Sequence, residues 1–398
     1  MKRHAFLFSF GMVFIVFQAC EHFEPVAPAE NALLDGPVEG LSPAENIRFL
    51  KGDVAFNDDV FTASNGLGPL FVATTCGTCH PGDGKGHPFT TLTRFGQYDG
   101  TGNQYAHLGG PQLQHRALPG FAPEVLPDNV GFSKLTPPAN TGLGFLDAVR
   151  DADIMAWADP NDNDGDGISG VPNWIVMKEY ITARDGTIEH EGKYIGRFGK
   201  KAAAYDLHQQ TAQAYNEDIG ITSTYEPMDT HSGLLIDPEI TDQTIHDVVF
   251  YLKTLKAPIP RAAHRDEIIS GKAVFEQIGC AKCHRSEMKT GDSPIAAIAN
   301  KTFHPYTDLL LHDMGADLDD GYTEGSATTS EWRTPALWGL GLSKFSQGGD
   351  YFLLHDGRAK SIDEAILWHG GEAANARAQY KSLTSTEKNK LIQFLESL

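Results

Sequence analysis

Two short motifs hold residue types that can attach and ligate an iron porphyrin. They share the pattern Cys-x-x-Cys-His: Cys76, Cys79 and His80 in the first, and Cys280, Cys283 and His284 in the second. In such a motif each thiol adds to one vinyl group of the porphyrin, and the adjacent histidine reaches the iron from the proximal side. The sequence therefore predicts two covalently bound haem c groups.

A single zinc ion held by both cysteine pairs is the alternative interpretation. Histidine makes up only 16 of 398 residues, so chance would rarely place it directly after both pairs. The repeated histidine favours haem over zinc.

An acidic stretch between the two motifs has the features of a cation-binding loop. Asp162, Asp164 and Asp166 alternate along the chain and Gly167 follows, as in the first half of a calcium loop. Position twelve, counted from Asp162, is Asn173 and not the bidentate glutamate of an EF-hand. The loop predicts a structural Ca²⁺, with a solvated Asp/Gly turn as the alternative.

Charge and the N-terminal sequence limit where the chain works and what it binds. With 32 basic and 52 acidic residues the net charge is −20, which argues against nucleic-acid binding. Lys2 and Arg3 precede an apolar run at 6–17, and a small residue precedes Cys20, which is typical of a lipoprotein signal peptide. We expect a periplasmic protein held at a bacterial membrane only by a lipid on Cys20; ordinary secretory cleavage with an unpaired Cys20 is the alternative.

The cysteine count agrees with this assignment. There are five cysteines, of which one is the lipid candidate and four are haem thioethers, so none remains for a disulfide. No segment after the N-terminal one is apolar enough to cross a membrane.

Helix signals repeat around the two motifs. A capping box at Ser42 predicts a helix through Leu50, and the apolar spacing at 245–255 predicts another before Pro258. The same pair recurs as an amphipathic helix at 268–278 and a capped helix from Thr384 to the C-terminus, and a further helix is expected from about Lys200 to Gly220.

This repetition predicts a mainly α fold of two cytochrome c-like domains with long irregular loops, such as 81–144. The expected segments are a signal peptide at 1–20, a flexible tether at 21–41, a first haem domain with the calcium loop at 42–260 and a second haem domain at 261–398.

Several further motifs resemble those of known di-haem enzymes. The segments at 332–337, 351–358 and 361–366 are similar to the C-terminal half of bacterial di-haem cytochrome c peroxidases. The chain also resembles the di-haem oxidoreductase family of peroxidase-like proteins. The similar segments lie at 112–114, 164–170, 196–199 and 369–373, and they follow one another in the same order as in that family.

The resemblance implies ligands for the second haem. In the relatives the distal ligand follows the Glu-Ala segment, which places His369 in that role. Met314 is the rival ligand, and His312 and His355 are further alternatives; His355 is also suited to ordering the turn at Asp356.

The resemblance also implies residues at the first haem. The relatives carry a tryptophan between the haems, where this chain has Ala106 beside Tyr105, and a polar pair at the peroxide site, which Gln114 and Glu124 would supply. Glu124 would exchange protons with peroxide. Three further histidines remain open as ligands of the first iron: His87, His107 and His115.

Together these features lead us to expect an exported di-haem oxidoreductase that reduces hydrogen peroxide. Its electrons would come from a small donor of the cytochrome c or cupredoxin type. The alternatives are an electron-transfer cytochrome without peroxidase activity and an oxidoreductase acting on another substrate.

Overall fold

The computed structural model describes residues 29–96 and 111–398. The expected signal peptide and Cys20 lie outside the described residues, as do Tyr105, Ala106 and His107. The described part contains eleven α-helices: α2 (Pro43–Asn57), α3 (Cys76–Cys79), α4 (Leu143–Asp147), α5 (Asp151–Met155), α6 (Leu207–Ile219), α7 (Asp242–Thr254), α8 (Asp266–Gln277), α9 (Ser343–Ser346), α10 (Ile362–Trp368), α11 (Ala374–Ser382) and α12 (Ser385–Ser397).

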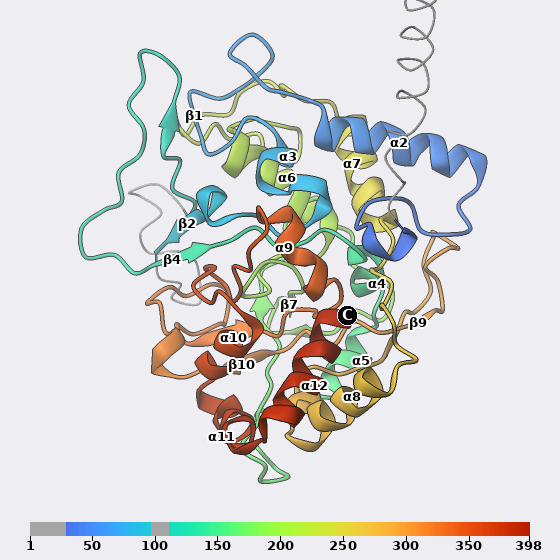
Figure 1. Cartoon of the computed structure of the whole chain (residues 1–398). Helices are drawn as coiled ribbons and strands as arrows, with labels where there is room; N and C mark the ends of the chain where they lie inside the picture. Colours follow the sequence, from blue (N-terminus) through green and yellow to red (C-terminus); the bar gives the residue numbers. More distant parts are fainter. Residues whose placement is uncertain (1–28, 97–110) are drawn as a thin grey trace, which may run out of the picture.

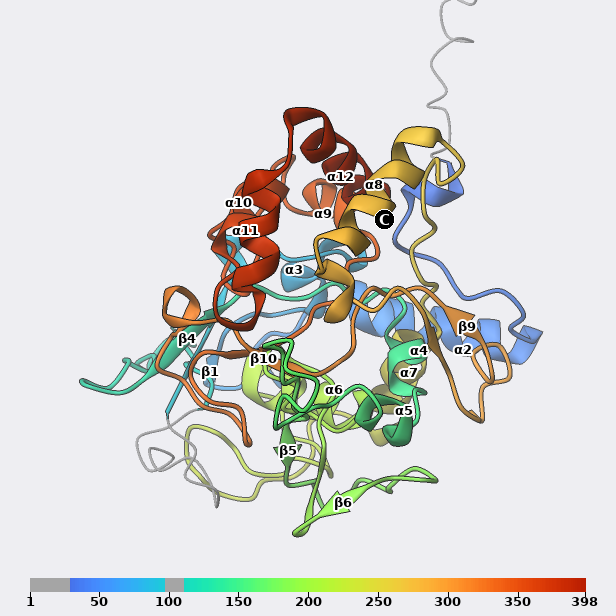
Figure 2. The ribbon, with the colours of Figure 1, turned by 90° about the horizontal axis from the view of Figure 1, so that it is seen from below.

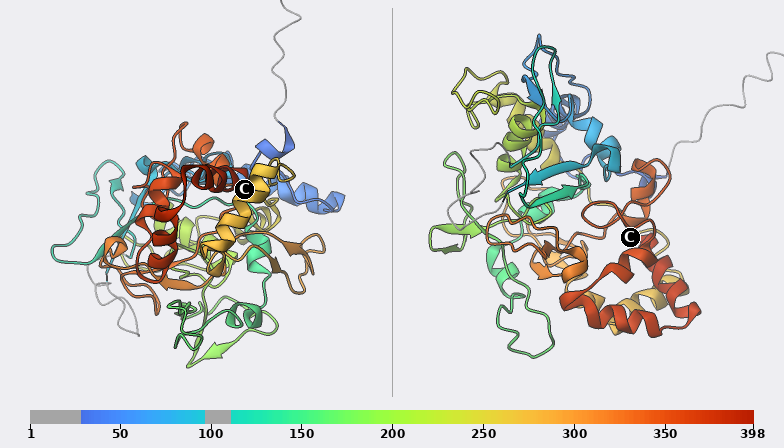
Figure 3. Two further views of the ribbon diagram at one scale, coloured as in Figure 1. Left: turned by 60° about the horizontal axis from the view of Figure 1, so that its bottom comes forward. Right: turned by 90° about the vertical axis from the view of Figure 1, so that its left-hand side faces the viewer.

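The helix that precedes each motif packs on the helix that ends the same half of the chain. α2 lies against α7, and α8 lies against α12, at the two ends of the molecule in Figure 1 and in the right-hand view of Figure 3. A glycine allows each close approach: a Cβ on Gly52 would lie 2.1 Å from the Asp247 carbonyl oxygen, and one on Gly271 would lie 2.1 Å from that of Lys390. The two halves thus repeat one helix pair, as the sequence pattern predicted.

Capping side chains fix the ends of these helices. Ser42 and Glu45 form the predicted capping box of α2, and Thr384 and Glu387 form that of α12. The prediction of a helix from Lys200 was wrong at its start: α6 begins at Leu207, because Asp206 caps it by accepting from the Gln209 amide at 2.8 Å.

In the part of the chain that the structure describes, the strands are short and form five small antiparallel sheets. The pairs are β1 (Leu70–Phe71) with β3 (Arg116–Ala117), β2 (Leu92–Phe95) with β4 (Phe132–Leu135), β8 (Met288–Lys289) with β9 (Thr302–Phe303), β10 (Leu311–Asp313) with β11 (Glu331–Arg333), and the triplet β5 (Trp174–Ile175), β7 (Lys193–Ile195) and β6 (Glu189–His190). The edge strand β6 lies away from the C-terminal helices in Figure 2. The fold is a mixture of helices and long loops, and no barrel occurs in the described part.

The two halves share their hydrophobic core across the expected boundary at 260/261. The larger core joins residues of 49–255 with Met288, Phe303 and Leu310, and the smaller core holds α8, α10 and α12. Backbone pairing of Val149 with Thr290 also links the halves. The second half therefore sends the segment around 288–310 into the first, which a linear division of the chain does not describe.

The described part of the expected tether is held against the fold. The Val38 amide donates to the Thr254 carbonyl at 2.7 Å, and the Lys256 amide donates to that of Gly36 at 3.0 Å. Among residues 29–96 and 111–398 we find no helix with the length and apolar character needed to span a membrane.

Candidate functional site

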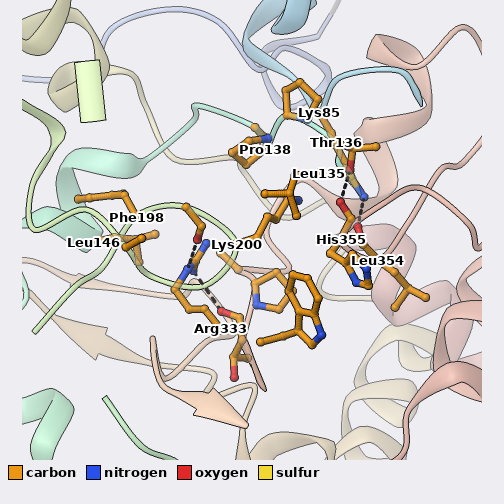
Figure 4. Close-up of a pocket in the computed structure, with 18 of the residues that line it drawn as sticks. Lys85, Leu135, Thr136, Pro138, Leu146, Phe198, Lys200, Arg333, Leu354 and His355 are labelled. Carbon is orange, nitrogen blue, oxygen red and sulfur yellow. Dashed lines mark hydrogen bonds between the residues drawn. The ribbon is translucent and has the colours of Figure 1, made fainter. Parts of the chain in front are cut away.

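One internal cavity of about 700 Å³ connects the two Cys-x-x-Cys-His motifs. Each motif forms a single helical turn, α3 in the first and a 3-10 turn at Cys280–Lys282 in the second. Both cysteines and the histidine of each motif line the cavity. Figure 4 shows part of the cavity wall, to which Lys85, Lys200, Arg333 and His355 contribute from distant segments.

Both motif histidines are oriented through the ring nitrogen that faces away from a metal. The Nδ1 atom of His80 donates to the Pro138 carbonyl at 2.9 Å, and that of His284 donates to the Tyr306 carbonyl at 3.0 Å. A carbonyl can only accept, so Nδ1 carries the proton and Nε2 keeps its lone pair. Burial lowers the pKa of both imidazoles to about 4, which keeps them neutral and able to ligate a metal.

At the second motif, His369 has the same orientation. Its Nδ1 donates to the Ala365 carbonyl at 2.8 Å, just beyond the end of α10, and its ring lines the cavity. The charge on His369 contributes, after burial, to lowering the pKa of His284, so the two rings lie near one another. Met314 also lines the cavity and packs beside Trp332. His369 therefore lies near the second motif, and Met314 lines the same cavity.

His312 is unavailable as a ligand because both of its nitrogens are engaged. Nε2 lies 2.9 Å from Asp308 Oδ2, and Nδ1 lies 2.6 Å from Glu372 Oε2. Burial alone would lower the pKa of His312, but hydrogen bonds to Asp308, Cys283 and Glu372 raise it well above its ordinary value. The ring is a buried imidazolium between two carboxylates, with Nδ1 only 3.6 Å from the Cys283 sulfur.

His355 stacks on Trp332 in the cavity wall. The ring centroids are 3.7 Å apart and the planes differ by 9°. The His355 carbonyl accepts from both the amide and the hydroxyl of Thr136, which ties the loop at 351–358 to the first half of the chain. Burial lowers the pKa of His355 to about 3, so the stacked ring is neutral.

Gln114 and Glu124 do not line the cavity. The Gln114 side chain accepts from the Thr230 hydroxyl at 2.8 Å and donates to the Glu217 carbonyl at 3.0 Å. The Glu124 carboxylate accepts from the Gln114 backbone amide at 2.6 Å. The structure therefore brings the predicted pair together, but it uses their polar atoms to hold loops.

Other polar residues face the cavity beside the first motif: Arg94, Gln112, Glu217 and Asp218. The Gln112 side-chain amide donates to the Asp218 carboxylate. Burial, and then the charge of Glu217, raises the pKa of Asp218 to about 7. Asp218 in turn contributes to the raised pKa of both Cys76 and Cys79, so it lies close to the attachment point.

Arg94 holds this polar group in place. Its guanidinium lies 2.8 Å from Glu217 Oε2 and 2.9 Å from Glu324 Oε1, and its Nε donates to the Tyr322 hydroxyl. Gln112 lies in the family-like motif at 112–114, but no sequence pattern marks Asp218, which only the tertiary fold brings to Gln112.

The remaining histidines offered for the first iron lie elsewhere. His87 Nδ1 accepts from the Phe89 amide at 3.1 Å, and His115 is exposed. Among the described residues that line the cavity, the imidazole and thioether side chains are His80, His284, His312, His355, His369 and Met314.

Comparison with known proteins identifies the family. Residues 124–398 match the model of a family described as "Di-haem oxidoreductase, putative peroxidase". The chain belongs to the di-haem oxidoreductase family. No curated protein matches it.

Two solved structures are similar to this chain. One is a hydrazine synthase of Kuenenia stuttgartiensis, with 13% identity over 94% of each chain and a TM-score of 0.40. The other is a MauG-like protein associated with microbial copper homeostasis, with 13% identity over 94% of this chain and 95% of that chain and a TM-score of 0.40.

Membership of a di-haem family is matched by the chemistry of the cavity. Burial raises the pKa of Cys76, Cys79 and Cys280 to about 12, so these thiols are protonated in the absence of a metal. Within 29–96 and 111–398, no group of three or more potential ligands brings the two cysteine pairs onto one metal. Two separate proximal histidines in a mainly apolar cavity fit two haems and do not fit one zinc.

The acidic loop of this di-haem oxidoreductase docks beside the second motif. The carboxylates of Asp159, Asp162 and Asp164 come within 4.8 Å of one another, whereas Asp166 instead pairs with Lys282 at 2.8 Å. The Ser169 hydroxyl donates to Glu372 at 2.5 Å. The loop therefore contacts both the second motif and the Glu372 carboxylate that binds His312.

Proposed function

We propose that this di-haem oxidoreductase is a peroxidase that reduces hydrogen peroxide to water. Its two haem c groups would be attached through Cys76 and Cys79 and through Cys280 and Cys283, each in a cytochrome c-like domain. The observation that carries the proposal is the asymmetry of the single cavity. His369 lies near His284 of the second motif, whereas the carboxyl and amide pair of Asp218 and Gln112 lies near Cys76 and Cys79 of the first.

Haem supplies the redox chemistry at such a site, because its iron can bind peroxide wherever one axial position is open. The chain supplies the rest. His80 and His284 would each ligate one haem iron, and His369 would be the second protein ligand of the haem attached at Cys280 and Cys283, with Met314 as its rival. Gln112 positions the Asp218 carboxyl, which accepts one proton of peroxide and returns it to the departing oxygen. Overall, one peroxide takes up two electrons and two protons and gives two waters.

The electrons would come from a small periplasmic carrier of the cytochrome c or cupredoxin type. The N-terminal sequence supports export and a lipid on Cys20, which would hold the protein at a bacterial membrane. The grouped carboxylates of Asp159, Asp162 and Asp164 support a structural Ca²⁺ in the loop that contacts the second motif.

The test is to mix the fully reduced protein with hydrogen peroxide and follow the haem Soret band. We expect rapid two-electron oxidation in the wild type and slow oxidation in the Asp218→Asn variant. Asp128→Asn, which alters an exposed carboxylate, is the matched control and should behave as the wild type does. Oxidation of the wild type no faster than that of a bis-histidine cytochrome would exclude peroxidase activity.

Electron paramagnetic resonance separates the peroxidase from a plain electron carrier. A first haem with one open position would give a high-spin ferric signal in the oxidised or half-reduced protein. Exclusively low-spin signals in both states would favour the electron-transfer cytochrome.

A further inference from the structure

Three cationic side chains enter the haem cavity from separate segments. Lys85 follows the first motif by five residues, Lys200 lies in the loop before α6, and Arg333 ends β11. All three line the cavity, and Figure 4 shows them around its central part, near His355.

Among residues 29–96 and 111–398, no carboxylate lies within the 4.0 Å of an ion pair from any of these three cations. The Lys85 ammonium donates to the Leu354 carbonyl at 3.2 Å, and Arg333 donates from Nε to the Gly199 carbonyl at 3.0 Å and from Nη1 to the Thr334 carbonyl at 3.2 Å. The Lys200 ammonium has no hydrogen-bond partner among the described residues.

The nearest acidic groups are already engaged. The charge of Asp356 favours the protonated form of both lysines and so raises their pKa, but the Asp356 carboxylate binds Arg358 at 2.8 Å. The charge of Asp308 raises the pKa of Arg333, but the Asp308 carboxylate binds His312 at 2.9 Å. No described carboxylate therefore forms an ion pair with the cluster of Lys85, Lys200 and Arg333.

Buried charge without a counter-charge is unfavourable, since the cavity wall cannot replace the lost hydration. Burial lowers the pKa of Lys200 to about 7 and that of Arg333 to about 10, and it lowers the pKa of Lys85 well below its ordinary value. An anion bound at the cluster would reverse this penalty by charge-assisted hydrogen bonds.

Carboxylates attached to the occupant of the cavity would supply this charge. Each haem carries two propionates on the edge opposite its vinyl groups, and the vinyl edge of the first haem is fixed at Cys76 and Cys79. The charge of Lys200 contributes to the lowered pKa of His80, which places the cluster within electrostatic reach of the first proximal ligand.

We propose that Lys85, Lys200 and Arg333 form the propionate-binding site of the first haem. The inference rests on the proposed haem attachment but not on peroxidase activity. Through this site a segment of the second half, β11, holds a group attached to the first half. The site thus fixes the first haem relative to the Trp332–His355 stack, whose aromatic rings adjoin Arg333 and Leu354.

The experiment measures reduction potentials and resonance Raman spectra of haem-loaded Lys200→Met. Loss of the cation unmasks a propionate charge, which favours the ferric state. We expect the ratio of ferric to ferrous first haem at a fixed potential to rise at least tenfold, which is about 59 mV for one electron. The propionate bending bands should shift, and Lys200→Arg should restore both properties.

The matched control is Lys178→Met. Lys178 also lines the cavity, but its ammonium is paired with Glu226 at 2.8 Å. In Lys178→Met the ratio of ferric to ferrous first haem at a fixed potential should therefore change less than twofold. Lys85→Met provides an independent variant should Lys200→Met fold poorly.

Haem content is measured first, because it distinguishes a failure of the propionate site from a failure of the proposed haem attachment. Fewer than two haems in the wild type would refute the attachment itself. With two haems present, unchanged propionate bands and potentials in both Lys200→Met and Lys85→Met would overturn the propionate site. A wild-type spectrum that titrates with added chloride, and loses that response in Lys200→Met, would also overturn it, because the cluster would then bind a free anion.

Discussion

The two ends of the cavity orient their motif histidines in the same way but differ in the side chains around them. His80 and His284 each donate from Nδ1 to a backbone carbonyl, at 2.9 and 3.0 Å. His369 lies near the second motif, and Met314 lines the same cavity; both side chains can ligate iron. Near the first motif lie Gln112 and the Asp218 carboxyl, which is suited to proton exchange. The comparison shows that two copies of one motif differ in the surroundings that distant residues give them.

The strongest test of this difference is the pH dependence of peroxide reduction. Asp218 must be ionised to accept a proton from peroxide, and its pKa is raised to about 7 by burial. The rate should therefore rise as pH increases through about 7 in the wild type. In Asp218→Asn it should be lower by about 10²–10⁴-fold and independent of pH in that range.

Stopped-flow oxidation of the reduced protein between pH 5 and pH 9 measures both effects. Asp128→Asn serves again as the control, and it should keep the wild-type profile. A variant Asp218→Asn that keeps both the rate and the profile would remove Asp218 from proton transfer.

The next test concerns the second end of the cavity. In His369→Ala the second haem should lose its distal ligand and change from low-spin to high-spin in electron paramagnetic resonance. Peroxide turnover should fall by about 10–100-fold, since disturbed metal sites lose activity on that scale. Met314→Leu, of similar size, should leave the spin state unchanged.

The reverse outcome would assign the ligand to Met314. In that case Met314→Leu would become high-spin while His369→Ala stayed low-spin. Either result keeps the second end closed, whereas two unchanged spectra would contradict the asymmetry between the sites.

How far the sequence predicts this molecule depends on whether the signal is local. The capping boxes of α2 and α12 and the motifs around Cys76 and Cys280 are local, and the structure has each of them in place. The charge cluster of Lys85, Lys200 and Arg333 has no local signal, because loops from three parts of the chain assemble it.

The first site shows the same limit at closer range. The resemblance to di-haem peroxidases selected Gln114, but Gln112, two residues earlier, faces the cavity and binds Asp218. Gln114 is equally buried and binds Thr230 instead. An alignment of motifs cannot decide between two glutamines in one extended run, since the choice depends on where α6 places Asp218.

A smaller effect is expected from the carboxylate that binds His312. Glu372→Gln would leave the buried imidazolium with Asp308 as its only carboxylate, at 2.9 Å. We expect the free energy of unfolding to fall by about 1–3 kcal/mol, the usual effect of removing one partner of a buried charged hydrogen bond. Denaturant unfolding followed by haem absorbance at each motif measures it. Glu364→Gln, on the first turn of α10, is the control; an equal loss in both variants would show that His312 gains nothing from Glu372.

The smallest effect should come from the exposed contact between the acidic loop and the second motif. The Lys282 side chain is 45% exposed and that of Asp166 is 26% exposed, so their ion pair is screened by water and salt. Asp166→Asn should lower the free energy of unfolding by less than about 1 kcal/mol, with the loss vanishing at high salt. A chelator should have the larger effect if Asp159, Asp162 and Asp164 bind Ca²⁺, because it would release the loop that also contacts Glu372. Equal unfolding curves with and without chelator would argue against a bound Ca²⁺. If Asp166→Asn also lowered the free energy of unfolding slightly, the ion pair with Lys282 and the Ser169 contact would be what attaches this loop to the second end of the cavity.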